Sequence, residues 1–246
     1  MAQYDTIRTA GAGVRTAQID EGLRAHFNKV YGLMSVAMVL TGAVAWAVGS
    51  NDALLGIFRD PATLQPNILG WIAMFAPLIM VFAFSAMINK MSASAAQVFF
   101  YAFAAAMGLS ISYIFALYTG VSIAQTFLVT AIAFSGLSLY GYTTKKDLSG
   151  WGRFLIMGLI GLIAAMIVNI FLGSPAIAFA VSVIGVLIFA ALTAYDTQRI
   201  KTEYIQHAQY GDQEWLAKSA IFGALSLYLN FINMFMFLLQ FLGNRE

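Results

Sequence analysis

The chain has 246 residues, of which 61% are hydrophobic and 10% are charged, and its formal net charge is +2. Soluble domains carry about 25% charged residues, so the composition excludes a water-soluble globular protein and predicts a membrane protein. The small net charge gives no reason to expect a nucleic-acid partner. The absence of cysteine excludes disulfides, thiolate metal sites and cysteine nucleophiles.

Residues 1–26 are polar, and we expect them to form a cytoplasmic tail ahead of a transmembrane domain at residues 27–246. The tail lacks the apolar stretch of a cleavable signal peptide, so the first span should serve as its own insertion signal. Two histidines, His26 and His207, both lie outside the uncharged runs. They cannot form a metal cluster, and we expect no resident cofactor.

Seven uncharged runs of 19 to 24 residues follow the tail, and all charged residues fall outside them. About 20 apolar residues suffice for a helix to cross the hydrocarbon core of a bilayer. The sequence therefore predicts an all-α bundle of seven transmembrane helices in the lipid bilayer. The runs cover residues 30–48, 69–88, 95–118, 121–142, 154–173, 176–195 and 219–241.

The positive charges predict the orientation of the bundle. With the amino terminus inside, eleven basic residues face the cytoplasm and only Arg59 and Arg245 face outward, as the positive-inside rule requires. The carboxyl terminus is then external if the seventh run crosses fully, and cytoplasmic if that run re-enters. Charge counting leaves both alternatives open.

Two outer connections are too short to join anything except adjacent antiparallel helices. Thr119-Gly120 separates the third and fourth runs, and Gly173-Ser-Pro175 separates the fifth and sixth.

A polar stripe runs along one face of the seventh run. Lipid would leave its amides without hydrogen-bond partners, so this face must contact protein or water. One interpretation is hydrogen bonding between helices. The other is the lining of a pathway, in which Ser226 and Asn233 are pore-lining candidates and Phe237 is an apolar constriction toward the outside. The stripe comprises Ser219, Gly223, Ser226, Asn230, Asn233, Phe237 and Gln240.

Asp196 directly follows 42 positions without a charge. One interpretation is a solvated residue at the end of a helix that pairs weakly with Arg199, three positions further on. The other is a functional carboxylate that meets Asn230 of the seventh run. Asn230 lies eleven residues past Ser219, about 16 Å along a helix. The two side chains therefore meet only if the seventh helix begins before its run or the sixth helix continues beyond its own.

Three segments together resemble the signature of the Bax inhibitor-1 family, also called the transmembrane Bax inhibitor motif family. They are Tyr140-Gly-Tyr-Thr-Thr-Lys-Lys-Asp-Leu-Ser149, Thr193-Ala-Tyr-Asp-Thr-Gln198, and Leu227-Tyr-Leu-Asn-Phe-Ile-Asn233 running into Leu242-Gly-Asn-Arg245. The resemblance covers most of the chain and points to a bacterial member in the inner membrane. It implies six helices wrapped around a central seventh.

The resemblance also implies a pH-sensitive leak channel for calcium or other cations. Asp196 matches the first functional aspartate of the family, Asn230 stands where a second aspartate is common, and Lys90 matches a cation that can pair with the first. Two facing carboxylates share a proton and act as a pH switch. Asn230 keeps the shape and a donor but cannot ionise, so we expect weakened pH sensing. Asp196, as a single carboxylate, should hold calcium only in passing.

An alternative function belongs to a different class. The chain could be a non-conducting regulator that binds membrane proteases or other membrane proteins through its tail and cytoplasmic loops. A retinal protein is excluded because the seventh run has no lysine, and an intramembrane serine protease is excluded because no run contains a histidine. We therefore expect no enzymatic activity.

Overall fold

A computed structural model describes residues 2–60 and 63–244, and side chains from residue 19 onward except that of residue 209. Within these ranges the regular structure is helical, apart from an isolated bridge between Arg59 and Pro66. The helices are α1 (Ala2–Gly49), α2 (Asp52–Phe58), α3 (Ile68–Met87), α4 (Ala93–Ile111), α5 (Ile114–Leu117), α6 (Gly120–Thr143), α7 (Trp151–Leu172), α8 (Pro175–His207), the short 3-10 helix η1 (Ala208–Tyr210) and α9 (Gln213–Leu242).

Seven stretches of helix in the described residues are long and apolar enough to span a membrane, which confirms the predicted bundle. They are α3, α6, α7, α8 and α9, the part of α1 from Ile19 to Gly49, and a stretch from Ala93 to Leu117 that joins α4 and α5. The first span continues the helix that begins in the polar tail.

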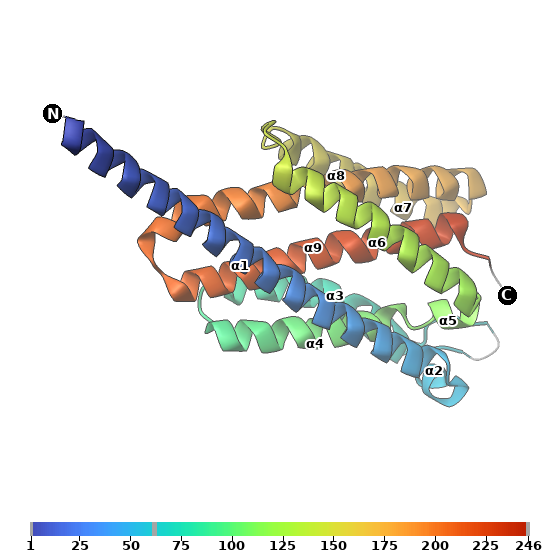
Figure 1. Ribbon diagram of the computed structural model, residues 1–246. Helices are drawn as coiled ribbons and strands as arrows, with labels where there is room; N and C mark the ends of the chain where they lie inside the picture. The colour runs from blue at the N-terminus through green and yellow to red at the C-terminus, as the bar shows by residue number, and fades with distance from the viewer. Residues whose placement is uncertain (1, 61–62, 245–246) are drawn as a thin grey trace.

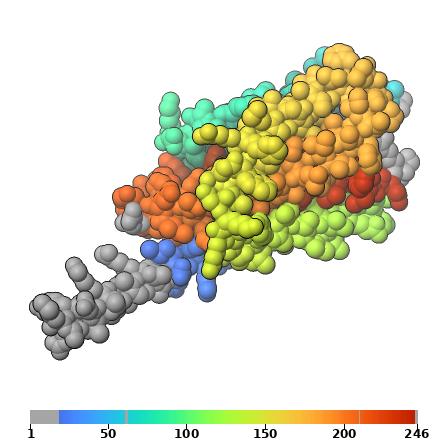
Figure 2. All heavy atoms as spheres, turned by 90° about the horizontal axis from the view of Figure 1, so that it is seen from above, coloured from blue at the N-terminus to red at the C-terminus, as the bar shows by residue number. Residues whose placement is uncertain are grey.

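Helix α9 is the most buried of the spans. Two thirds of its most apolar 18-residue stretch is buried, whereas the corresponding fraction is 11 to 39% for the other spans. It packs mainly against α8, α1, α6 and α4, while α3 packs on α4 and α7 packs on α8 (Figure 1). In the space-filling view α7, in yellow, covers part of the outer face beside α8 in orange (Figure 2). The bundle is therefore layered around α9, with α3 and α7 on the outside.

Helix α9 also runs the full length of the bundle. The two chain ends lie at opposite ends of the molecule (Figure 1). Near the carboxyl end, Thr119 donates its backbone N–H to the carbonyl of Asn244, and Asn244 donates to Ser122 Oγ at 2.9 Å. This end of α9 therefore sits beside the short connection before α6, as a complete crossing requires. The re-entrant alternative does not fit this arrangement.

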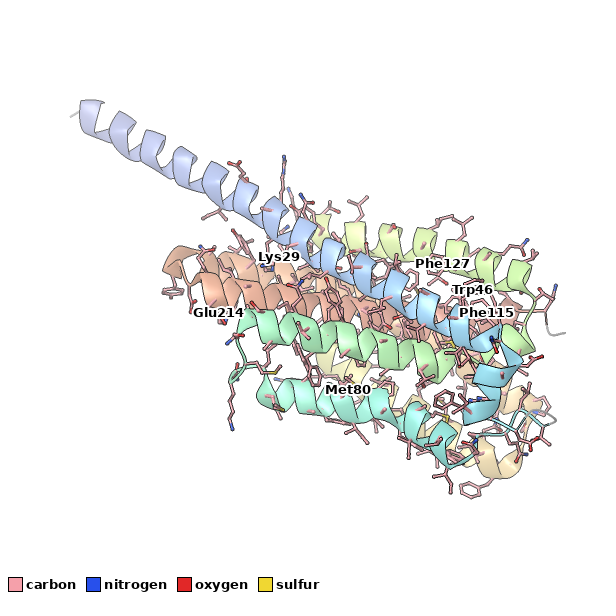
Figure 3. The ribbon with its side chains drawn as sticks, turned by 90° about the horizontal axis from the view of Figure 1, so that it is seen from below. Lys29, Trp46, Met80, Phe115, Phe127 and Glu214 are labelled. Atoms are coloured by element: carbon pink, nitrogen blue, oxygen red, sulfur yellow. The ribbon has the colours of Figure 1, made fainter. Side chains whose placement is uncertain are left out.

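The two ends of the bundle differ in their side chains. Lys29 and Glu214 lie toward the end where α1 extends from the bundle, and Trp46 and Phe115 lie toward the other (Figure 3). Glu214 Oε1 accepts the backbone N–H of Ala93 at 2.8 Å. This bond connects the start of α9 to the start of α4.

The tight turn between α7 and α8 forms as its sequence predicts. Gly173 adopts a positive φ of 59°, Ser174 caps α8 by accepting the N–H of Ile177, and Pro175 occupies the first turn. Glycine tolerates the left-handed conformation, and proline has no N–H to leave unpaired in that turn. The turn places α7 and α8 side by side.

A buried hydroxyl cluster joins α1, α4 and α9. Thr41 Oγ1 donates to the carbonyl of Ala104 at 2.8 Å and lies 2.7 Å from the hydroxyl of Tyr228, which is fully buried. Because the Thr41 proton goes to a carbonyl, Tyr228 is the donor in the second contact. These bonds fix the rotation of α9 relative to α1.

Candidate functional site

Asp196 does not end a helix. Helix α8 continues eleven residues past it to His207, and α9 begins at Gln213, seventeen residues before Asn230. No glycine or proline interrupts α8 after Asp196. The chain then turns at Gly211, whose φ is 67°, and Asp212 caps α9 by accepting the N–H of Trp215 at 3.0 Å. Both extensions that the sequence left open are present, and they bring residues 196 and 230 to the same level.

The two side chains form a direct hydrogen bond. Asn230 Nδ2 donates to Asp196 Oδ2 at 2.7 Å, and the exposed fractions of the two residues are 4% and 7%. A hydrogen bond to a carboxylate at this distance and burial is among the stronger ones in proteins. The contact is the central polar connection between α8 and α9.

Arg199 engages the other oxygen of the same carboxylate. Its Nη2 lies 3.1 Å from Asp196 Oδ1 and donates to Ser226 Oγ at 3.1 Å, while Nε lies 3.7 Å from Glu203 Oε1. The side chain of Arg199 is about a third exposed, so the guanidinium lies between the buried pair and the surface. The pairing with Arg199 is therefore present, but within the bundle and together with Asn230.

Lys90 occupies a different place. It is exposed in the turn between α3 and α4. Among the described residues, the cation within ion-pair distance of Asp196 is Arg199. The structure thus brings Asp196 and Asn230 together and leaves Lys90 away from them.

The polar stripe of α9 faces α8 over much of its length. Ser226 bonds to Arg199, Asn230 to Asp196, and Gln240 Oε1 accepts from Ser182 Oγ at 2.9 Å. Asn233 instead donates to the carbonyl of Leu229 on its own helix at 2.8 Å. Hydrogen bonding between helices therefore accounts for much of the stripe in this conformation.

Phe237 closes the space beyond the polar pair. Its ring stacks on Phe189 with centroids 6.0 Å apart. A Cβ at Gly185 would come within 2.6 Å of the Phe237 ring. Glycine at 185 thus lets the ring press against the backbone of α8 and fill the space between α8 and α9 at this level.

A pocket of mixed polar and apolar lining lies past the phenylalanine pair, toward the Gly173 turn. It has a volume of about 450 Å³ and is lined by residues that include Asn169, Ser174, Ser182 and Gln240. On α8, Ser182 is fourteen residues from Asp196, about 21 Å along a helix. The phenylalanine pair separates this pocket from the carboxylate.

The loop that carries the first family segment is bound to α8 close to Asp196. Gln198 Oε1 accepts the N–H of Leu148 and Gln198 Nε2 donates to the carbonyl of Lys146, both at 2.7 Å. Within the loop, the backbone and side chain of Ser149 bond to Asp147 and lower the pKa of that exposed carboxyl. The loop and the Asp196 segment therefore form one structural unit.

The described residues contain no group of three His, Cys, Asp or Glu side chains able to hold a metal ion. Asp196 has one oxygen bonded to Asn230 and the other paired with Arg199. A cation passing this point would therefore have to displace at least one of these contacts.

The sequence did not predict several residues of this site. Glu203 lies four residues after Arg199, a spacing that predicts an ion pair on a helix once α8 is known to continue that far. Phe189 and Gly185 lie in an apolar run of α8 with no local signal that distinguishes them. Their role depends on Phe237, which comes from another helix.

Comparison with known proteins agrees with these features. Residues 23–246 match the family described as inhibitor of apoptosis-promoting Bax1. An uncharacterized protein of Caulobacter vibrioides is 46% identical over 93% of this chain and 92% of its own length. Inner membrane protein YbhL of Escherichia coli K12 is 46% identical over 92% of this chain and 94% of its own. The uncharacterized protein RP147 of Rickettsia prowazekii is 41% identical over 98% and 99%. The chain belongs to the Bax inhibitor-1 family and is a multi-pass integral membrane protein.

Proposed function

We propose that the protein is a passive leak channel for calcium or similar cations, with Asp196 as its gating carboxylate. The observation that carries this proposal is the buried bond from Asn230 to Asp196, together with the Arg199 contact. Ionisable groups inside a membrane bundle are costly, and they often mark substrate or ion pathways. Family membership supports the same assignment.

The proposed pathway follows the interface between α8 and α9. It starts at the pocket near Ser182 and Gln240, passes Phe237, and reaches Asp196. Apolar constrictions block ions by excluding water, and a carboxylate attracts cations. The pathway is closed at Phe237 and at Asp196 in this conformation. Conduction requires movement of the Phe237 ring and release of the carboxylate.

Asn230 gives this chain a distinct form of the gate. The amide donates to Asp196 as a protonated carboxyl group would, but it carries no exchangeable charge. We infer that pH acts here through Asp196 alone. The response should therefore be weaker than that of a pair of facing carboxylates.

The test is calcium flux into liposomes that contain the purified protein. Calcium should enter down its gradient without ATP or a coupled ion, and Phe237→Ala should raise the rate because it widens the constriction. Asp52→Asn, which alters an exposed carboxylate on α2, a helix that packs on α1 and α3, serves as the matched control and should leave the rate unchanged. A rate equal to that of empty liposomes between about pH 6 and 8 would instead favour the non-conducting regulator of membrane partners.

The proposed orientation places the amino terminus in the cytoplasm of a bacterial cell. A reporter at residue 10 should then read cytoplasmic, while reporters in the loop near Arg59 and after residue 246 should read external. Eleven of the thirteen basic residues then face inward. The reverse readings at these sites would contradict this orientation.

A further inference from the structure

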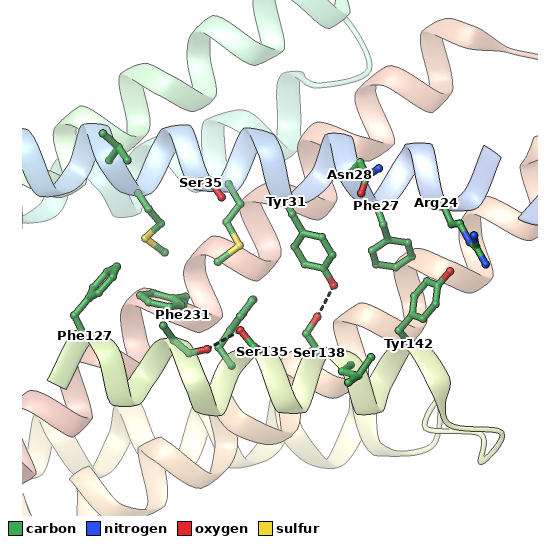
Figure 4. A pocket seen from close by; sticks show the side chains of 16 residues that line it. Arg24, Phe27, Asn28, Tyr31, Ser35, Phe127, Ser135, Ser138, Tyr142 and Phe231 are labelled. Carbon is green, nitrogen blue, oxygen red and sulfur yellow. Dashed lines mark hydrogen bonds between the residues drawn. The ribbon is translucent and has the colours of Figure 1, made fainter. Parts of the chain in front are cut away.

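A groove between α1 and α6 lies on a different face of α9 from the one that carries Asn230. It has a volume of about 740 Å³ and is lined from Arg24 to Val39 on α1 and from Phe127 to Tyr142 on α6, with Phe231 of α9 as its floor (Figure 4). Specific ligand pockets typically measure about 300 to 1,000 Å³. Val39 and Leu139 at its rim are 73% and 63% exposed, so the groove opens sideways at membrane depth.

Three hydroxyls in the lining of the groove, those of Tyr31, Ser135 and Ser138, are hydrogen-bonded within the protein. Tyr31 Oη and Ser138 Oγ lie 2.6 Å apart, and Ser138 Oγ lies 2.9 Å from Thr197 Oγ1. This chain of hydrogen bonds leads away from the groove into α8. The apolar side chains of the lining are largely methionine and phenylalanine, so this surface suits a flexible apolar chain.

The length and depth of the groove match one leaflet of a bilayer. Val39 is the midpoint of the uncharged run 30–48 and thus lies near the bilayer centre. Arg24 comes fifteen residues earlier, about 22 Å along a helix. Half of the hydrocarbon core measures about 15 Å, and the headgroup layer adds about 5 to 7 Å. A lipid whose acyl chain reaches the bilayer centre therefore has its headgroup at the level of Arg24.

Two basic side chains lie at the mouth of the groove. Arg24 is exposed, and no ion pair involves it among the described residues. Lys201 Nζ donates to the carbonyl of Tyr142 at 2.7 Å and lies 5.2 Å from the centre of its ring. Asn28 adds an amide beside Arg24 (Figure 4). These groups are suited to an anionic phosphate headgroup, which basic residues bind at membrane surfaces.

We propose that this groove binds one anionic phospholipid from the leaflet on the amino-terminal side. One acyl chain lies between α1 and α6 against Phe231, and the phosphate contacts Arg24. The bilayer supplies this ligand at the depth and in the direction at which the groove opens. The site is separate from the proposed cation pathway, since Phe231 and the helices α1 and α6 form it without Asp196 or Phe237.

The experiment uses the purified protein with phosphatidylglycerol or phosphatidylcholine, each with a photoreactive group in the middle of one acyl chain. Cross-linked peptides are identified by mass spectrometry. Labelling should concentrate on residues 31–39 of α1 and 127–139 of α6. Phosphatidylglycerol should label about fivefold more strongly than phosphatidylcholine, as expected for a basic residue near an anionic headgroup.

Two variants, each with a control, test binding of the headgroup and of the acyl chain separately. Arg24→Ala should remove the preference for phosphatidylglycerol, while Arg153→Ala, an exposed arginine outside the groove, should keep it. Ser135→Trp should fill the groove and abolish labelling by both lipids. Ile132→Trp, an exposed position of α6 outside the lining, should not. Thermal unfolding of each variant in detergent confirms that it is folded.

Three results would overturn the proposal. Labelling spread evenly over α3, α6 and α7 would show ordinary annular lipid. Equal labelling by both lipids would remove the role of Arg24. Absence of labelling in the wild-type protein would show that another protein segment covers the groove.

Discussion

Helix α9 packs differently on its two sides. Toward α8, the helix meets its neighbour through a buried carboxylate, an amide and a stacked aromatic pair, with the Phe237 ring pressed against Gly185. Toward α1 and α6, Phe231 is the floor of an open groove. In lipid, apolar surface need not be covered by protein, whereas polar groups must be paired. The polar side is therefore closed around Asp196 and Phe237, whereas the apolar side is open.

The largest effect should come from forcing apart α6 and α8, which pack closely next to the Asp196 site. Gly141 of α6 packs against the backbone carbonyl of Ala194, so a side chain there would overlap it. Gly141→Leu should lower the free energy of unfolding by about 3 kcal/mol, measured by chemical or thermal unfolding in detergent. Gly136→Leu, on the same helix with open space around it, is the control. Equal losses for both variants would show that close packing at Gly141 does not matter.

A smaller effect should follow from breaking the polar contact itself. Asn230→Ala removes the donor to Asp196 and should cost about 2 kcal/mol of unfolding free energy, because a buried carboxylate then loses a partner. Asn233→Ala removes an amide that bonds only within its own helix and should cost clearly less. The same unfolding measurement compares them. A larger loss for Asn233→Ala would place the stabilising contact elsewhere on α9.

The third prediction concerns the pH response of the leak. In Asn230→Asp, two facing carboxyl groups cannot both ionise cheaply and should share a proton. Its calcium leak should therefore change more steeply with pH than that of the wild-type protein. Asp196→Asn should remove the wild-type response, since it replaces the buried carboxylate of the pair. Leak is measured against pH for all three in identical liposomes, and superimposable curves would falsify a gating role for this pair.

The smallest effect is expected on the open side. Ser135→Leu adds an apolar side chain to an exposed position of the groove, where space is available. Its unfolding free energy should change by less than about 0.5 kcal/mol. Unfolding in detergent tests this alongside Gly141→Leu. A loss as large as that of Gly141→Leu would mean that α1 and α6 close together in solution.

The sequence by itself determined the seven spans and the family. Uncharged runs of membrane-spanning length fix helices wherever water is absent, because backbone groups must then bond within their own segment. The Gly173-Ser-Pro175 turn was predictable for local conformational reasons. Asp196 and Asn230 were also identified in advance, the first because it ends a long uncharged stretch and the second because it lies in the polar stripe.

Tertiary structure decided what these residues contact. Uncharged runs mark where lipid begins, but they do not mark where a helix stops, so the continuation of α8 past Asp196 was not visible in the composition. That continuation brings Asp196 level with Asn230 and makes Arg199, rather than Lys90, its ionic partner. The groove depends on the spacing between α1 and α6, which α9 sets from the middle of the bundle. Such contacts depend on which helix faces meet, and the pattern of residues along one sequence does not predict which faces pair.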